Sequence, residues 1–140
     1  MVFITRRERF SAAHRLFNPG WSDVKNDSFY GGCANPNWHG HNYELWITVK
    51  GDVKQEFGYL VDLKLLGSLI KEHIISKLDH KNINAEVDFM KGKMVSTENL
   101  AIAIWDQIQP YLKAIDVNLH CVKIQEIENN FVEYFGNTKN

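Results

Sequence analysis

Two histidines separated by one glycine, His39-Gly40-His41, restrict the local fold more than any other feature of this sequence. Residues 41–51 alternate between apolar and polar side chains, which predicts a strand buried on one face. Side chains two positions apart on a strand point to the same face, so the two imidazoles should lie side by side. Imidazole suits zinc, and catalytic zinc commonly takes three protein ligands and leaves one position open. The pair therefore indicates half of a metal site.

The third candidate ligand comes from the first predicted strand. Residues 2–13 alternate loosely, and His14 stands at the end of that strand. If the two strands are antiparallel neighbours, the end of the first meets the start of the second, so His14 should lie near His39 and His41. A lone histidine at a strand end more often serves packing, and a lone His-x-His pair is more often a surface feature. Three histidines from adjacent strands instead predict a metal site.

Further reactive side chains occur at suitable places in the chain. Cys33, six positions before His39, is either a fourth ligand or a separate reactive thiol beside the metal. Asp79 and His80 can orient each other for proton transfer, although an isolated Asp-His pair is more often a charge pair at a helix end. Cys121 falls on a regularly alternating segment, which indicates packing. Two cysteines make no disulfide framework, so we expect free thiols in a reducing cytoplasm.

The remaining periodicity predicts an α+β domain spanning residues 1–140. Helical spacing of apolar residues predicts one helix over 62–77, with Asp62 as N-cap, and a second beginning after Ser96. Alternation of apolar and polar side chains predicts two further strands. The segments between the predicted helices and strands are polar, which predicts loops. The order ββααββ favours a four-stranded antiparallel sheet with two helices packed on one face. The expected last strands are 119–128 and 131–135, with a tight turn at Asn129-Asn130, and the expected loops are 17–38 and 81–95.

Composition excludes several classes of partner. The formal net charge of −1 gives no general attraction to nucleic acid or to an anionic membrane. No stretch approaches the roughly 20 apolar residues that span a bilayer. At the N-terminus the apolar residues precede the charged ones, which is the wrong order for a secretory signal. The uncovered sheet face would carry Trp46 and other large groups, which predicts cover by another subunit.

Taken together, these motifs resemble the 6-pyruvoyl-tetrahydropterin synthase family. Five matched segments occur in the family's order and span nearly the whole chain, which is more specific than any one of them. They are Phe10-Ser11-Ala12-Ala13-His14-Arg15-Leu16, Cys33 to Tyr43, Leu78-Asp79-His80-Lys81-Asn82, Val95-Ser96-Thr97-Glu98-Asn99-Leu100-Ala101, and Glu126 with Asn129-Asn130.

The resemblance implies a fold, an assembly and a reaction. The fold would be the tunnelling fold (T-fold), whose subunits join their sheets into trimeric barrels that stack as a homo-hexamer. The substrate would be a pterin triphosphate, 7,8-dihydroneopterin triphosphate, and the product 6-pyruvoyl-tetrahydropterin, formed with loss of triphosphate. His14, His39 and His41 would hold Zn²⁺, whose open position would take the hydroxyls of the substrate side chain.

The resemblance also implies roles for the other residues. Cys33 would be the general base, and Asp79 with His80 the second proton-handling pair. Glu126 would anchor the pterin by accepting two charge-assisted hydrogen bonds from its amino group and the adjacent N–H. Ser96 and Thr97, at a helix start, would add contacts to the same ring.

Other functions stay open. The related 6-carboxytetrahydropterin synthase of queuosine biosynthesis acts on the same substrate, but its usual cysteine-to-histidine spacing is shorter than here. A non-catalytic pterin-binding module would not need Cys33 or the Asp79-His80 pair. A structural zinc domain is disfavoured because the chain has no thiolate-rich knuckle. Trp38 stands where many relatives have a small residue, and it would narrow the mouth of the pocket.

Overall fold

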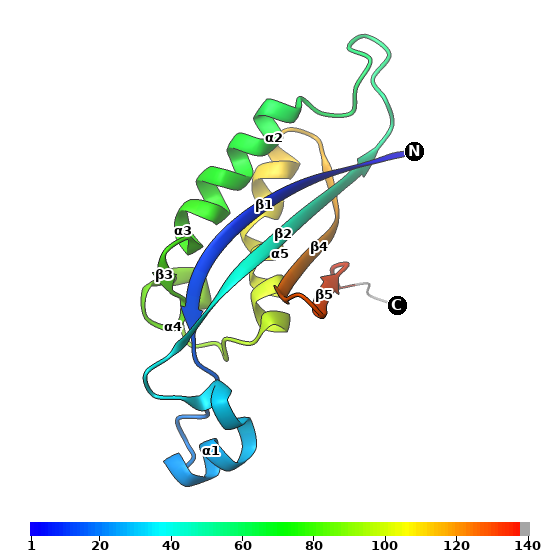
Figure 1. Cartoon of the computed structure of the whole chain (residues 1–140). Coiled ribbons are helices and arrows are strands. Elements are labelled where there is room, and N and C mark those ends of the chain that lie inside the picture. Colours follow the sequence, from blue (N-terminus) through cyan, green and yellow to red (C-terminus); the bar gives the residue numbers. More distant parts are fainter. Residues whose placement is uncertain (138–140) are drawn as a thin grey trace.

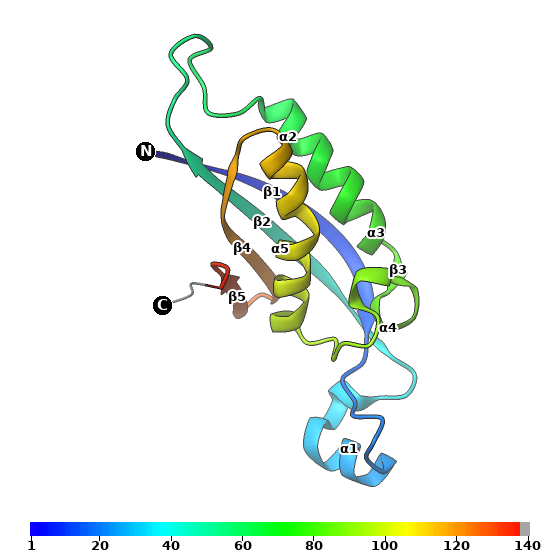
Figure 2. The same cartoon turned by 180° about the vertical axis from the view of Figure 1, so that it is seen from behind.

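The fold is a two-layer α+β arrangement, seen in a computed structural model of the chain that describes residues 1–137. Figure 1 shows the long strands crossing in front, and Figure 2 shows the helices covering only one face of the sheet. The elements are β1 (Val2–His14), α1 (Asp23–Tyr30), η1 (Gly31–Ala34), β2 (His39–Gly51), α2 (Leu63–Ile70), η2 (Lys71–Ile75), α3 (Ser76–Leu78), β3 (Lys81–Asn82), α4 (Ile83–Glu86), η3 (Asp88–Met90), α5 (Thr97–Ala114), β4 (Asn118–Ile127) and β5 (Asn130–Tyr134).

The sheet has the strand order β3-β1-β2-β4-β5. β1, β2, β4 and β5 pair antiparallel in sequence order, which confirms the predicted four-stranded core of the sheet. The predicted strand count was wrong by one, because β3 adds a short fifth strand parallel to β1. β3 is only two residues long, which is too short to give a periodic signal in the sequence.

The two predicted helices are present with the predicted caps. The Asp62 side chain accepts hydrogen bonds from the first turn of α2, and the Ser96 hydroxyl accepts one from the N–H of Asn99 in α5. The first helical run continues from α2 through a π-helical turn, η2, into α3. Gly67 in α2 has a packing role, because a Cβ there would lie 3.2 Å from the Arg6 guanidinium carbon.

The two segments predicted as loops contain short helices. Residues 17–38 form α1 and η1, and residues 81–95 form β3, α4 and η3. Polar side chains hold these elements: the Ser22 hydroxyl accepts from the N–H of Lys25, and the buried Asn26 amide bonds to neighbouring backbone groups. Apolar periodicity cannot detect a helix that is organised by capping and amide hydrogen bonds rather than by a buried apolar face.

The predicted hairpin between β4 and β5 is present, with its turn at Glu128 and Asn129 rather than at Asn129-Asn130. Asparagine signals a tight turn because it tolerates the left-handed conformation, but neither Asn129 nor Asn130 has a positive φ here. The register shift between Gln125 and Ile127 changes the backbone path beside the turn, which allows a short connection without that conformation.

The core lies between the helices and the inner face of the sheet. Leu45, Ile47, Leu66, Ile104 and Ile108 have no measurable exposure and belong to one apolar cluster. The outer face has no helical cover among residues 1–137, and there Trp46 lies between the charged groups of Arg7 and Lys123. No helix of the described chain has the length and apolar character needed to cross a membrane.

Two features of the sheet position the functional groups. The β1–β2 register places His14 opposite His39 and Ala12 opposite His41, at the end of the sheet next to α1. β1 has a strand neighbour on its other side only at Ala12 and Ala13, where β3 pairs with it. Most of the outer edge of β1 therefore has no strand beside it in the described chain.

Candidate active site

The three predicted ligand histidines meet at one end of the sheet. His14, His39 and His41 each offer one ligand atom, and these atoms all lie within 4.8 Å of one another. The imidazole of His14 lies 4.5 Å from that of His39 and 5.1 Å from that of His41, measured between ring centroids. The predicted convergence of the three side chains is thus confirmed by the strand register.

Each of the three histidines has a buried ring nitrogen with no hydrogen-bond partner: Nε2 of His14, Nδ1 of His39 and Nε2 of His41. In His14 the other nitrogen, Nδ1, lies 2.9 Å from the carbonyl oxygen of Val95. A carbonyl can only accept, so Nδ1 carries the proton and Nε2 keeps a free lone pair. Metal-bound histidines usually have such a second hydrogen bond, which fixes ring orientation and tautomer. The donor set therefore fits a divalent metal.

Burial favours the neutral imidazoles that a metal requires. Loss of solvation lowers the pKa of His14, although the Val95 carbonyl and the Glu126 carboxylate partly oppose this. Loss of solvation likewise lowers the pKa of His41, again opposed by Glu126. A neutral imidazole presents a lone pair to a cation without first losing a proton. The lowered pKa values of His14 and His41 are therefore compatible with metal binding.

Glu126 links the histidine cluster to a neighbouring pocket. One of its carboxylate oxygens lies 3.1 Å from Nε2 of His41, without hydrogen-bond alignment, and the other accepts from the Thr97 hydroxyl. The pocket has a volume of about 370 Å³ and is lined by Ser96, Thr97, Glu126 and Phe131, among others. Ser96 and Thr97 thus come together with Glu126, which is distant in sequence, in a pocket beside the histidine cluster.

Cys33 lies on η1 and is half-buried. It is not a member of the group of candidate ligands formed by the three histidines. The carbonyl oxygen of Cys33 accepts a hydrogen bond from the N–H of Leu16, 2.8 Å away, just beyond the end of β1. Of the two roles left open by the sequence, the geometry favours a thiol that is separate from the three histidines.

Asp79 and His80 form a pair, but not beside the histidine cluster of the same chain. The His80 Nδ1 lies 3.0 Å from an Asp79 oxygen, and the other Asp79 oxygen accepts from the N–H of Ser11. The Ser11 N–H and His80 hold the pKa of the Asp79 carboxyl below its ordinary range. The Ser11 hydroxyl points to the outer sheet face, where it bonds to Asn42 in a shallow pocket of about 450 Å³.

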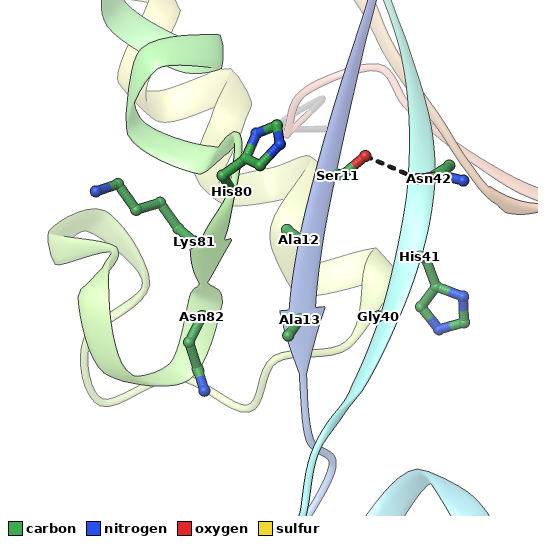
Figure 3. A pocket seen from close by; sticks show the side chains of 9 residues that line it. All are labelled: Ser11, Ala12, Ala13, Gly40, His41, Asn42, His80, Lys81 and Asn82. Atoms are coloured by element: carbon green, nitrogen blue, oxygen red, sulfur yellow. Dashed lines mark hydrogen bonds between the residues drawn. The ribbon is translucent and has the colours of Figure 1, made fainter.

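The two histidine groups lie on opposite flanks of the β1–β2 strand pair. Figure 3 shows His80 beside β1 and His41 beyond β2, with the two strands between them. The His80 side chain is 83% exposed, whereas His14 is 2% exposed. The structure therefore gives His80 an open outer position, whereas His14 is enclosed and His41 is partly buried.

Several supporting groups were not identified from the sequence. The Val95 carbonyl is a backbone group, so no residue-type signal could reveal its role. Tyr43 is buried, and its unpartnered hydroxyl belongs to a ring 5.6 Å from that of His41. Its position two residues after His41 on the same strand face would have been a usable signal. Trp38 has φ +66°, a left-handed conformation that favours glycine.

The fold and the site define a small α+β protein with a group of three histidines that could hold a metal ion, next to a carboxylate-containing pocket. The family model described as "6-pyruvoyl tetrahydropterin synthase" matches residues 3–137. The chain belongs to the 6-pyruvoyl tetrahydropterin synthase family, an enzyme family, and its fold is the tunnelling fold.

Individual relatives agree with this assignment. The chain is 47% identical over 135 residues to the 6-pyruvoyl tetrahydrobiopterin synthase of Dictyostelium discoideum, covering 96% of each protein. The solved structure of the Caenorhabditis elegans 6-pyruvoyl tetrahydropterin synthase matches with a TM-score of 0.90 at 32% identity, covering 97% of this chain and 96% of that one. A 6-carboxy-5,6,7,8-tetrahydropterin synthase of Rickettsia typhi is 29% identical, covering 95% of this chain and 99% of that protein.

Proposed function

We propose that this chain is a carbon–oxygen lyase that converts 7,8-dihydroneopterin triphosphate to 6-pyruvoyl-tetrahydropterin with loss of triphosphate. The observation that carries the proposal is the cluster of three buried, unpartnered imidazole nitrogens beside Glu126. The 47% identity to a relative named for the pyruvoyl product supports this reaction over the carboxy alternative, whose named relative is 29% identical. The absence of a membrane-crossing helix among the described residues is compatible with a cytoplasmic enzyme.

The proposed cofactor is Zn²⁺, held by His14, His39 and His41. Neutral nitrogen ligands and a three-residue set suit catalytic zinc. When bound, this ion would polarise the hydroxyls of the substrate side chain and acidify the neighbouring C–H bonds. The Val95 carbonyl holds the His14 ring in the orientation that keeps its free nitrogen toward the other two histidines.

The pterin ring is proposed to bind in the pocket beside Glu126. The Thr97 hydroxyl donates to one oxygen of Glu126, which fixes the carboxylate at the start of α5. A carboxylate held in this way can accept two hydrogen bonds from the amino group and adjacent N–H of a pterin. Ser96 lines the same pocket and would contact the ring edge.

Proton transfer is assigned to Cys33 and to the Asp79–His80 pair. The Cys33 thiolate would remove a proton from the substrate side chain, while a C–O bond to the triphosphate breaks and the triphosphate leaves as an anion. Asp79 accepts from the Ser11 N–H and lies beside His80 Nδ1, so it would hold the imidazole in one orientation for proton donation and acceptance.

The outer-face position of Asp79 and His80 supports a homo-hexamer, a dimer of trimers. The strands β1 and β2 lie between His80 and the His41 side chain of the same chain, so the proposed mechanism has the Asp79–His80 pair serve the site of a neighbouring subunit. The largely unpaired outer edge of β1 and the sheet face without helical cover are surfaces that such an assembly would use.

Product identification is the direct test. Purified zinc-loaded protein is incubated with 7,8-dihydroneopterin triphosphate, and the pterin product and free triphosphate are identified by mass spectrometry. The 6-pyruvoyl product with equimolar triphosphate is expected. A 6-carboxy product would contradict the proposed reaction and identify the chain as a carboxypterin synthase. Pterin binding without turnover would identify it as a binding module.

Two matched variants test the assigned residues. His41→Ala should lose most of the zinc measured by elemental analysis while its helical circular dichroism persists, and full zinc content would contradict the metal assignment. Cys33→Ala should keep zinc and pterin affinity and lose about 10²–10⁴-fold in turnover. Cys121→Ala is the control, because this buried thiol packs on β4 and should leave turnover unchanged.

A further inference from the structure

The segment that carries Cys33 projects beyond the end of the sheet and has few attachments to it. Figure 1 shows residues 17–38 extending from the point where β1 ends and β2 begins. Gly31 and Gly32 precede Cys33, and a side chain at either glycine would contact nothing within 4 Å. Side-chain packing therefore contributes little at the two glycines before the thiol, so hydrogen bonds have a larger part in positioning this stretch.

Two hydrogen bonds from the end of β1 hold this segment. The Nε of Arg15 donates to the carbonyl oxygen of Ala34 at 2.7 Å, and the N–H of Leu16 donates to the carbonyl oxygen of Cys33 at 2.8 Å. Ala34 is fully buried, so its carbonyl is a fixed acceptor. The other inter-residue hydrogen bonds from residues 31–38 that the structure describes stay within the same projecting segment.

Arg15 is itself held at both ends of its backbone. Its N–H donates to the Asn84 side-chain oxygen at 3.0 Å, and its carbonyl accepts from the Asn84 amide nitrogen at 3.0 Å. The guanidinium carbon lies 4.3 Å from the centre of the Phe17 ring, which restricts the side chain further. Asn84 belongs to α4, so a rigid connection runs from α4 through Arg15 to the residues around Cys33.

We propose that Arg15 is a positioning residue that sets the place of the Cys33 thiol relative to the histidine cluster, with Asn84 as its support. The guanidinium supplies a charged donor to the carbonyl that follows Cys33, and such bonds are shorter and stronger than neutral ones. This inference rests on the proposed function, because it assigns Arg15 an effect on turnover through Cys33. A thiol displaced by about 1 Å can lose on the order of 10²-fold in rate.

A double-mutant cycle tests the inference. Arg15→Met keeps the length of the side chain and removes the donor, and it is measured in the wild-type and Cys33→Ala proteins. In the wild-type background, kcat should fall about 10- to 100-fold with KM and zinc content unchanged. In the Cys33→Ala background the same change should have almost no effect, because residues that act through one group are not additive. Arg15→Lys, which retains a donor, should recover part of the loss.

Lys25→Met is the matched control. Lys25 lies on the same projecting segment and also places its cation over an aromatic ring, that of Trp21, at 4.2 Å. It makes no contact with the residues around Cys33 in the described hydrogen bonds, so its loss should leave kcat unchanged. An equal fall in kcat for Arg15→Met in both backgrounds, or a loss of zinc, would overturn the proposal.

Hydrogen exchange separates this inference from the proposed function. The amide of Leu16, bonded to the Cys33 carbonyl, should exchange about tenfold faster in Arg15→Met, whereas the amides of α5 should not change. An unchanged Leu16 rate would overturn the positioning role without any measurement of turnover. If Cys33→Ala instead turns over normally, the proposed base is wrong, and the exchange rate alone still decides whether Arg15 positions the segment.

Discussion

Acid should destabilise the metal-free protein well above the pH at which carboxylates titrate. His14 and His41 have lowered pKa values, chiefly because burial removes the solvation of the charged imidazole. In the unfolded chain both should titrate near the ordinary value of about 6.5. Below that pH these two histidines bind protons in the unfolded state but stay largely neutral in the native state. Unfolding therefore becomes more favourable as the pH falls. This stability is therefore present above about pH 6.5 and is lost progressively on acidification toward the lowered native pKa values.

The loss of unfolding free energy on acidification can be worked out from the two buried imidazole rings. Lowering the pH from about 7.5 to 5.5 shifts the unfolding equilibrium about tenfold for each histidine that stays neutral, which is about 1.4 kcal/mol each. The sum for His14 and His41, about 2.7 kcal/mol, is an upper value, because the Glu126 carboxylate partly stabilises both protonated forms. With a urea dependence of about 2 kcal/mol per molar, the urea midpoint should fall by up to about 1.4 M.

The assay is urea unfolding of chelator-treated protein, followed by tryptophan fluorescence at the two pH values and one protein concentration. His41→Gln serves as the comparison, because removal of one titrating ring should reduce the pH effect by about half. An equal midpoint at both pH values, or a higher one at the lower pH, would refute the claim that burial keeps these imidazoles neutral.

Three further predictions concern assembly and stability. Sedimentation should show a hexamer at micromolar concentration, and a stable monomer would contradict the proposed assembly. Hexamers refolded from a mixture of Cys33→Ala and Asp79→Asn subunits should regain activity that neither variant shows alone, whereas an inactive mixture would place both residues in one subunit's site. Ser96→Ala should lower the melting temperature by a few degrees, since removal of an N-cap costs about 1 kcal/mol, and calorimetry would show no shift if the α5 cap is unimportant.

The parts of the fold that the sequence predicted are those with a periodic apolar face. β1, β2, α5 and the strand pair β4–β5 each bury one face, and burial imposes a period that can be read from the residues. α1 and β3 bury no large apolar side chain, and α4 buries one, Ile83. These short elements depend on capping groups such as Ser22 and Asn82, so the sequence carried no periodic signal for them.

The candidate site likewise has a part that the sequence predicted and a part that it did not. The histidine cluster could be predicted because strand alternation and antiparallel pairing convert sequence spacing directly into proximity. The position of Asp79 and His80 on the outer flank could not be predicted, because it depends on the short parallel pairing of β3 with β1. The Arg15–Asn84 connection joins residues 69 positions apart through side-chain and backbone groups that no local pattern marks.

The unpaired outer edge of β1 has a consequence for how the protein must be handled. A long strand edge with free backbone donors and acceptors is a template for pairing with any other chain, and hence for aggregation. Charged side chains on an edge strand disfavour indiscriminate pairing, and β1 carries Arg7, Glu8 and Arg9. Arg7 and Arg9 pair with Glu44 of β2, and Glu8 pairs with Arg6, so ion pairs partly neutralise these charges. Salt screens the charge that remains, so refolding at low ionic strength should give a higher yield of soluble protein than refolding at high ionic strength.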